Sequence, residues 1–247
     1  MGSSTNKPEL IVNGKRLDGR GFADLRPMKI IAGGLKNAAG SAYMEWGNNK
    51  VLAAVYGPKE ALPKHTQDPD KAVIKCKYSM APFSSLEEHN RSGPNRRAIE
   101  ISKVTREVFE KVILREDFPG SEIDIFIEVL QSDGGTRAAG ITTAAVALAT
   151  SGIPMTDLPY AISVGKVGDT LILDLNKAED NYSDADMPIA IGPRNNDILL
   201  LQMDGSLTKE QISEGLTMAK KAGESVARLQ REALKAPYER ILEKYKI

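Results

Sequence analysis

The sequence has little of several residues on which common classes of protein depend. Its single cysteine, Cys76, excludes an intrachain disulfide framework and a zinc site built from several cysteines. A lone cysteine is typical of a reducing compartment, so we expect a cytoplasmic location. The only two histidines, His65 and His89, exclude a three-histidine metal site. Catalysis is therefore expected to depend on carboxylates, arginine, lysine or hydroxyl groups.

The sequence also lacks a net charge and a long apolar run. Its 33 Lys and Arg residues balance 33 Asp and Glu residues, which excludes binding of nucleic acid or membrane through overall positive charge. No run reaches the ~18 apolar residues of a membrane-spanning helix, so we expect no membrane association. Residues 1–9 have no signal-peptide pattern, and we interpret them as a disordered tip or an expression remnant.

What the sequence does have is the ordinary apolar content of a globular protein, 41%. Runs at 41–46 and 50–56 flank a Gly-Asn-Asn turn and predict a hairpin whose second strand stops at Gly57-Pro58. Apolar residues at three- and four-residue steps predict an amphipathic helix over 96–115. Further strands are expected at about 72–80, 123–129, 159–166, 170–175, 187–192 and 197–203.

Two more helices complete the predicted fold. The Ala- and Thr-rich segment 138–151 is apolar on nearly all sides and predicts a buried helix. A capping-box pattern at 208–211 predicts a helix that runs to about Lys235 and is interrupted at Pro237. The mixture of strands and helices predicts an α+β fold of two similar halves, 10–150 and 151–247.

The first candidate functional segment is Gly134-Gly135-Thr136-Arg137, between a predicted strand and the buried helix. Unpaired N–H groups at a helix start favour an anion, and glycines let a phosphate approach the backbone. Thr136 adds a hydroxyl donor, and Arg137 adds a planar fork for phosphate oxygens. The alternative is a plain strand-to-helix turn with a surface arginine.

A basic segment lies at the start of the amphipathic helix. Residues 91–115 hold seven Lys and Arg against three Glu, a local charge of +4 on a neutral chain. Arg96 and Arg97 oppose the helix dipole there unless an anion lies between them. This position indicates either an anion-binding site or a solvated charged turn.

An acidic segment lies farther along the chain. Residues 167–187 hold six acids and one lysine, and Asp180 and Asp186 lie within it. Crowded carboxylates suit Mg²⁺ or Mn²⁺, and they can act as general acid and base. The alternative is an acidic solvated loop, but the apolar strand that follows favours a loop pinned to the core. Together, the anion cradle, the basic segment and the acidic segment indicate phosphoryl transfer on a polyanion.

The order and spacing of these segments resemble the RNase PH family, and within it the catalytic RNase PH-type subunits of archaeal exosomes. The resemblance covers nearly the whole chain. It implies the RNase PH-like fold, which has two βαβ-type halves with mixed sheets and helices. The second domain of ribosomal protein S5 has a similar fold. It is carried by 16–20 (RLDGR), 40–43 (GSAY), 55–60 (VYGPKE), 131–137 (QSDGGTR), 152–155 (GIPM) and 184–188 (DADMP).

The resemblance implies a phosphorolytic 3′→5′ exoribonuclease, in which inorganic phosphate is a co-substrate and nucleoside diphosphates are released. The reverse reaction adds nucleotides to a 3′ end. Asp180 is then the general acid, and Asp186, with help from Asp180, binds Mg²⁺ or Mn²⁺. Sequence leaves open whether neighbouring acids or cations control the pKa of Asp180. The implied phosphate-binding residues are Arg97, Gly135, Thr136 and Arg137.

The resemblance also implies partners. Arg96 and Arg97 are expected to contact the RNA backbone, and Lys64 and His65 to lie in a loop that lines a central pore. Expected partners are the 3′ end of a single-stranded RNA and an inactive RNase PH-like paralogue in a ring of three heterodimers, to which RNA-binding cap proteins bind. One alternative is a homohexameric RNase PH that trims tRNA 3′ ends, and another is a non-catalytic ring subunit. Of these alternatives, the exosome subunit is favoured by the segment 186–190 (DMPIA).

Overall fold

The computed structural model describes residues 9–85 and 96–244. The predicted N-terminal tip, apart from Glu9, lies outside these ranges, as do His89, Arg91 and most of the irregular stretch before the first long helix. Within them a short hairpin, β1 (Ile11–Val12) and β2 (Lys15–Arg16), precedes two larger sheets.

The first sheet has the strand order β3-β4-β5-β7-β6. The predicted hairpin is confirmed, with Trp46 opposite Asn49 at its turn. Its second strand continues past Gly57-Pro58, so the predicted stop there is wrong. The register against the neighbouring strand shifts between Tyr56 and Lys59, and this irregularity accommodates the proline within the strand. The strands are β3 (Met28–Ala32), β4 (Gly40–Trp46), β5 (Asn49–Glu60), β6 (Val73–Met80) and β7 (Ser121–Gln131).

One pair in this sheet is parallel, β6 with β7, and the connection between them contains α1 (Arg96–Glu110). The prediction of a helix to residue 115 is wrong at its end, because Arg115–Asp117 forms a separate 3-10 turn, η2. Val112 and Ile113 are nevertheless buried after the helix has ended. The spacing of apolar residues therefore predicted correctly which side chains are buried, but it predicted too long a helix.

The second sheet has the order β11-β10-β8-β9, with β12 also paired to β10, and its pairs are antiparallel. The predicted strands of this half are confirmed, apart from small shifts at their ends. The acidic segment, for which a loop was predicted, instead contains a short helix, α3 (Lys177–Tyr182). The strands are β8 (Tyr160–Val167), β9 (Thr170–Leu173), β10 (Ala185–Gly192), β11 (Asp197–Leu201) and β12 (Asp204–Gly205).

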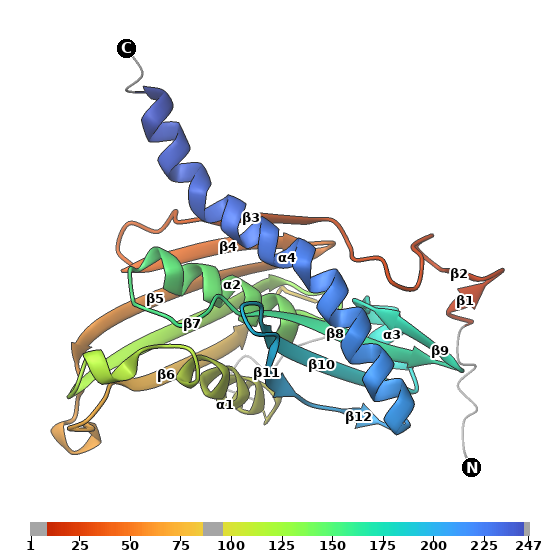
Figure 1. Ribbon diagram of the computed structural model, residues 1–247, viewed down its shortest axis with the longest axis horizontal. Helices are drawn as coiled ribbons and strands as arrows, with labels where there is room; N and C mark the ends of the chain where they lie inside the picture. Colours follow the sequence, from red (N-terminus) through yellow and green to blue (C-terminus); the bar gives the residue numbers. More distant parts are fainter. Residues whose placement is uncertain (1–8, 86–95, 245–247) are drawn as a thin grey trace.

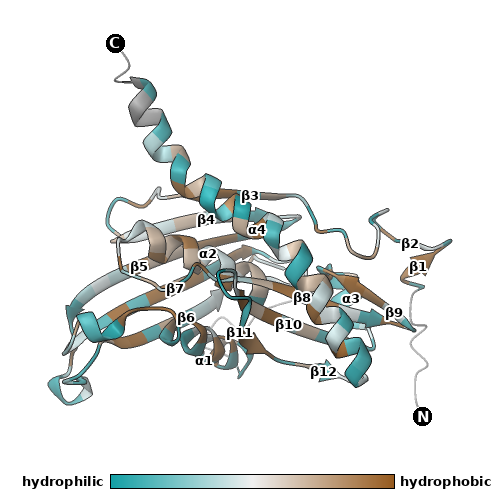
Figure 2. Ribbon diagram, viewed as in Figure 1, coloured by the Kyte–Doolittle hydropathy of each residue, from teal (hydrophilic) through white to brown (hydrophobic). Residues whose placement is uncertain are grey.

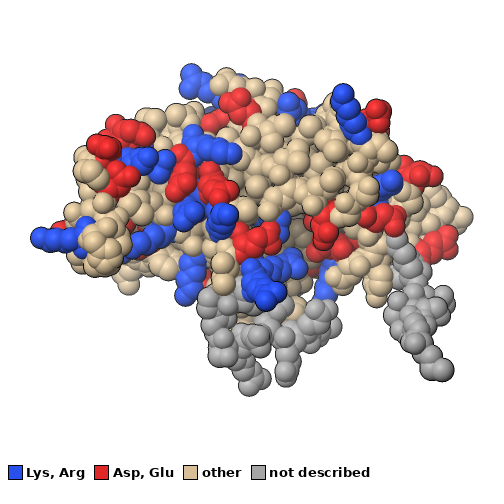
Figure 3. Space-filling model, turned by 90° about the horizontal axis from the view of Figure 1, so that it is seen from below, with Lys and Arg blue, Asp and Glu red and all other residues tan. Residues whose placement is uncertain are grey.

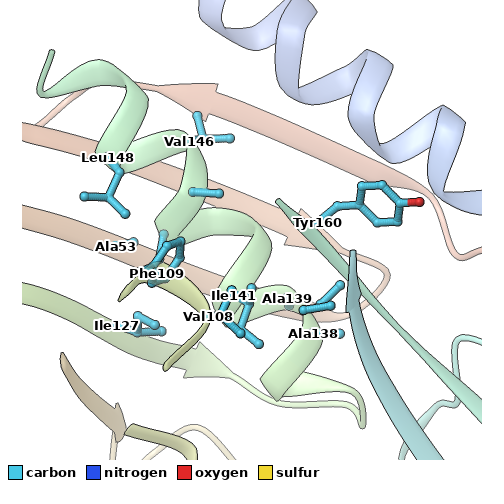
Figure 4. Packing of buried hydrophobic residues seen from close by; sticks show 14 of the residues in the cluster. Ala53, Val108, Phe109, Ile127, Ala138, Ala139, Ile141, Val146, Leu148 and Tyr160 are labelled. Carbon is cyan, nitrogen blue, oxygen red and sulfur yellow. The ribbon is translucent and has the colours of Figure 1, made fainter. Parts of the chain in front are cut away.

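The predicted buried helix is α2 (Thr136–Thr150), and it joins the two sheets into one core (Figure 1). It contacts β4, β5 and β7 of the first sheet and β8 and β10 of the second. Figure 4 shows Ile141 and Leu148 of α2 close to side chains from β7, α1 and β5. A Cβ on Gly140 would lie 3.2 Å from Ile127 Cγ2, so α2 approaches β7 closely at this position.

The long C-terminal helix, α4 (Lys209–Lys244), crosses β3 and β8 and contacts α2 (Figure 1). It is not interrupted at Pro237, so that prediction is wrong. A proline removes one helical hydrogen bond and strains the preceding turn, but the bonds on either side can carry the helix through it. Figure 2 shows hydrophilic and hydrophobic residues alternating along α4, as expected for a helix with one face on the protein. No helix in the described ranges is long and apolar enough to cross a membrane.

The contact between α4 and β8 leaves no room for a side chain at Gly223. A Cβ there would lie 2.0 Å from Cε2 of Tyr160, whose ring is buried. We expect Gly223→Ala to lower the free energy of unfolding by about 1–3 kcal/mol, measured by urea titration. Ser225→Ala is the control, because among the described residues its hydroxyl donates only to Ala222 O of the same helix. Since alanine is the better helix former, increased stability of Gly223→Ala would contradict this packing.

Candidate active site

A cavity of about 430 Å³ lies where α1, α2 and α3 meet the strands β10 and β12. Four of the predicted site residues line it, although they come from distant parts of the sequence: Arg97, Arg137, Asp180 and Asp186. The other lining residues are Glu100, Asn181, Pro188, Gln202, Met203 and Asp204.

The Gly-Gly turn at the start of α2 has a backbone that only glycine adopts readily. Gly134 and Gly135 have φ values of 69° and 66°, and Gly135 is the N-cap of α2. The turn is held by Asn49, whose Nδ2 donates to Gly134 O at 2.6 Å, and by Arg26, whose Nη1 donates to Asp133 O. The N–H groups of the first helical turn have no partner within α2, so they suit an anion.

Thr136 lies behind this turn and is itself buried, with 2% of its surface exposed. Its Oγ1 accepts a hydrogen bond of 2.8 Å from the Tyr78 hydroxyl, and it keeps its own hydrogen as a donor. Burial raises the pKa of Tyr78, which keeps that hydroxyl protonated. Gly135 and Thr136 come directly before Arg137 in the sequence, but of these three residues Arg137 alone lines the cavity.

Arg137 is already engaged by two side chains of the cavity wall. Its Nη1 donates to Gln202 Oε1, and its Nη2 donates to Glu100 Oε1 at 3.2 Å. Gln202 Nε2 also donates to Glu100 Oε1, at 3.0 Å. The three side chains therefore form a closed hydrogen-bonded triangle at one side of the cavity.

Asp180 is positioned by a short helix that is fixed at its start. Asn176 and Glu179 form a capping box, in which the Asn176 side chain accepts from Glu179 N and the Glu179 carboxylate accepts from Asn176 N. Glu179 also accepts two hydrogen bonds from Arg16, at 2.7 Å and 2.5 Å, and both side chains are almost fully buried. The hairpin β1–β2 thus anchors the helix that carries Asp180.

A second buried carboxylate, Asp174, anchors the strand before α3. It accepts from Arg26 Nη2 at 2.6 Å and from Trp46 Nε1 at 2.9 Å, and it is 2% exposed. Arg26 in turn donates to the Gly-Gly turn, so one arginine links that turn to β9. The anchoring roles of Arg16, Arg26 and Asp174 were not predicted from the sequence. The one available signal was that Arg16 lies in a segment that carries the family resemblance.

Two of the carboxylates that line the cavity, Asp180 and Asp186, have raised pKa values. Burial raises the pKa of Asp180, with Asp204 adding to it, and this outweighs the opposite effect of Arg97 and Arg137. Burial and the charge of Asp180 raise the pKa of Asp186 to about 7. For Asp180, whose balance the sequence left open, burial therefore prevails and the pKa shifts upward, the direction that favours a proton donor.

The donor set fits a divalent metal held mainly by other ligands. Asp186 Oδ1 is buried and has no hydrogen-bond partner among the described residues. In those same ranges no three His, Cys, Asp or Glu residues gather closely enough to form a protein-only metal site. Mg²⁺ is commonly bound by one or two carboxylates together with waters and substrate phosphates, which agrees with this arrangement.

Three predicted RNA-binding residues do not line this cavity. Arg96 is exposed at the first position of α1, next to the lining residue Arg97. Lys64 and His65 are exposed in the 3-10 turn η1 (Lys64–Thr66), beyond β5 and on the opposite side of the molecule from α3 (Figure 1). Any contact that Lys64 and His65 make with RNA would therefore be far from the cavity.

On one face of the molecule the charge is mixed rather than divided into large patches. Figure 3 shows one face on which Lys and Arg side chains lie among Asp and Glu side chains, and neither sign covers the face alone. The cavity repeats this on a small scale, with two arginines and four carboxylates in its lining. Although the chain has no net charge, positive and negative side chains therefore lie together in this cavity.

Known proteins share both the sequence and the fold of this chain. The profile of the 3′ exoribonuclease (RNase PH) family, domain 1, matches residues 24–154, and that of domain 2 matches residues 157–222. The chain is 58% identical over 229 residues to "Exosome complex component Rrp41" of Pyrococcus furiosus, covering 93% of this chain and 91% of that protein. It is 52% identical over 243 residues to the protein of that name from Thermoplasma acidophilum, covering 98% and 95%.

Two solved structures have the same fold. The crystal structure of rice (Oryza sativa) Rrp46 has a TM-score of 0.81 and 26% identity, and the match covers 89% of this chain and all of that one. A chain of the Archaeoglobus fulgidus exosome with RNA bound to the active site has a TM-score of 0.76 and 24% identity, with 89% and 92% covered. The family matches, the relatives and the fold agree, and the chain therefore belongs to the RNase PH family of 3′ exoribonucleases.

Proposed function

We propose that this chain is the catalytic subunit of an archaeal exosome ring and degrades RNA from the 3′ end by phosphorolysis. Its relatives at 58% and 52% identity are named as exosome components, and its family is one of 3′ exoribonucleases. The observation that carries the proposal is the cavity that places Arg97 and Arg137 beside Asp180 and Asp186. Two arginines suit two phosphates, and a buried carboxyl with a raised pKa suits proton donation.

The proposed reaction exchanges one phosphate ester bond for another. An oxygen of inorganic phosphate attacks the terminal phosphodiester, a new P–O–P bond forms, and the bond to the preceding 3′ oxygen breaks. Asp180 gives its proton to that leaving oxygen, so the products are a nucleoside diphosphate and an RNA shortened by one nucleotide. In the reverse direction Asp180 takes the proton back, and the RNA gains a nucleotide.

Arg97, Arg137 and the first turn of α2 stabilise the negative charge that gathers on the phosphate oxygens. The turn that begins α2 is held by Asn49 and Arg26 before the substrates bind, so its N–H groups need little rearrangement during the reaction. Gly135 provides the close backbone approach, and Thr136 provides a hydroxyl donor behind it. Asp186 and Asp180 would hold Mg²⁺ or Mn²⁺, which when bound stabilises charge on the phosphate oxygens.

The proposal extends to partners. The chain would alternate with an inactive RNase PH-like paralogue in a ring of three heterodimers, with RNA-binding cap proteins on one side and in the cytoplasm. Arg96 would contact the RNA backbone at the cavity entrance. Lys64 and His65, exposed far from the cavity, would contact the RNA at a distance from the reacting phosphates. The two halves of the ring subunit would be 10–150 and 151–247.

Phosphate dependence tests this proposal directly. The chain, alone and mixed with the paralogue, is incubated with poly(A), Mg²⁺ and increasing phosphate, and ADP and AMP are separated by chromatography. We expect ADP from the mixture only when phosphate is present, and little from the chain alone. AMP without phosphate would contradict phosphorolysis. Full activity of the chain alone as a homohexamer, measured by light scattering, would favour the tRNA-trimming enzyme instead.

A further inference from the structure

The contact between Glu100 and Arg137 places a carboxylate on the guanidinium that the proposed function reserves for phosphate. Glu100 Oε1 lies 3.2 Å from Arg137 Nη2, and Gln202 Oε1 accepts from Nη1. Two acceptor oxygens thus occupy the two ends of one guanidinium fork. A phosphate ion would present two oxygens to the same fork.

We propose that Glu100 is an internal competitor of inorganic phosphate for Arg137, and that it sets the phosphate concentration at which the enzyme works. This inference rests on the proposed phosphorolytic function. Phosphate binding displaces the Glu100 carboxylate into solvent, and release of the nucleoside diphosphate lets it return.

The exposure of Glu100 distinguishes it from the carboxylates that hold arginines permanently in this protein. The side chains of Arg16 and Glu179 are 0% and 1% exposed, and those of Arg26 and Asp174 are 6% and 3% exposed. The Glu100 side chain is 48% exposed, and within residues 9–85 and 96–244 its hydrogen bonds with Arg137 and Gln202 both end on Oε1. Exposed ion pairs are weak, so a phosphate can displace this one at small cost.

The charge of the cavity favours this displacement. Its lining contains two arginines against Glu100, Asp180, Asp186 and Asp204. An entering phosphate adds negative charge, so movement of one carboxylate into water relieves repulsion. Gln202 can contribute a further hydrogen bond to phosphate. Its Nε2 donates to Glu100 Oε1 at 3.0 Å, and when Glu100 leaves, this donor becomes available to a phosphate oxygen.

Glu100→Gln tests the inference because it removes the charge and keeps the size of the side chain. In the assembled enzyme with saturating poly(A), we expect the KM for phosphate to fall by about two- to fivefold with kcat unchanged. The KM for ADP in the reverse reaction should fall by a similar factor. Glu100→Asp, which keeps the charge on a shorter side chain, should give values between those of Glu100→Gln and the wild type.

Glu107→Gln is the matched control, because Glu107 lies on the same helix with 44% of its side chain exposed and pairs with Lys103 outside the cavity. It should leave the KM for phosphate unchanged. An unchanged KM in Glu100→Gln would overturn the inference, and so would a higher KM or a lower kcat, which would make Glu100 a positioning residue for Arg137. Calorimetric titration of inorganic phosphate measures the same change in affinity without turnover. Inactivity of the wild type would therefore count against the proposed function and leave this test in place.

Discussion

Replacing Asp180 with Asn is expected to lower kcat for phosphorolysis by about 100- to 10,000-fold, the usual contribution of a general acid. An amide has nearly the same size as the carboxyl but no acidic proton for the leaving 3′ oxygen. The KM for phosphate should change much less than kcat, because Arg97 and Arg137 remain in the cavity. Initial rates of ADP release from poly(A) in the assembled enzyme measure both constants.

Asp169→Asn is the control for this variant, because it makes the same chemical change at an exposed residue between β8 and β9 that does not line the cavity. It should leave kcat within about twofold of the wild type, since surface substitutions away from a site have small effects. A kcat for Asp180→Asn within tenfold of the wild type would show that another group protonates the leaving oxygen.

The second large effect is expected at the buried pair that anchors α3. Arg16→Met removes the nearest cation from the Glu179 carboxylate and leaves Arg20, whose Nη2 lies 3.7 Å from Glu179 Oε2. The side chains of Arg16 and Glu179 are at most 1% exposed. Removing one partner of such a pair typically lowers the free energy of unfolding by about 3–5 kcal/mol. Arg16 also donates to Leu173 O at 2.6 Å, so the loss includes a backbone contact to β9. Urea unfolding followed by circular dichroism measures the change.

The double variant Arg16→Met with Glu179→Leu separates the buried charge from general damage to packing. If the uncompensated carboxylate is the main cause, the double variant should regain part of the lost stability, because neither charge remains buried. If instead the double variant is less stable than the wild type by the sum of the losses of Arg16→Met and Glu179→Leu measured singly, the two side chains do not act as a pair. Both variants should also lose phosphorolytic activity, because α3 carries Asp180.

Several features of this protein could be predicted because they depend on residues close together in the sequence. The small apolar residues of 138–151 predicted a buried helix, and α2 is buried between the two sheets. The Gly-Gly step before it predicted a tight strand-to-helix turn, and both glycines have left-handed backbone angles. The hairpin around 47–49 follows from turn residues between two apolar runs. In each case the pattern and the structure it specifies lie within about one element.

Other predictions failed where local pattern and tertiary packing differ. Pro237 predicted a break, but α4 continues through it. The acidic segment predicted a loop, but Asn176 and Glu179 cap a short helix whose position is fixed from outside by Arg16. Spacing of apolar residues extended α1 to 115, because Val112 and Ile113 are buried in the turn that follows it. The spacing of apolar residues predicts which side chains are buried better than it predicts where a helix or strand ends.

The sequence by itself determined the family and, through the family, the chemistry expected of Arg97, Arg137, Asp180 and Asp186. Only the tertiary structure decided how those residues are held and what already occupies them. Arg16 binds Glu179 across 163 positions, Arg26 binds Asp174 across 148, and Glu100 meets Arg137 across 37. Such pairs leave no periodic signal, because each depends on where two distant segments meet after the core has formed. The direction of the pKa shift at Asp180 was decided in the same way, since burial outweighs the nearby arginines only once the cavity exists.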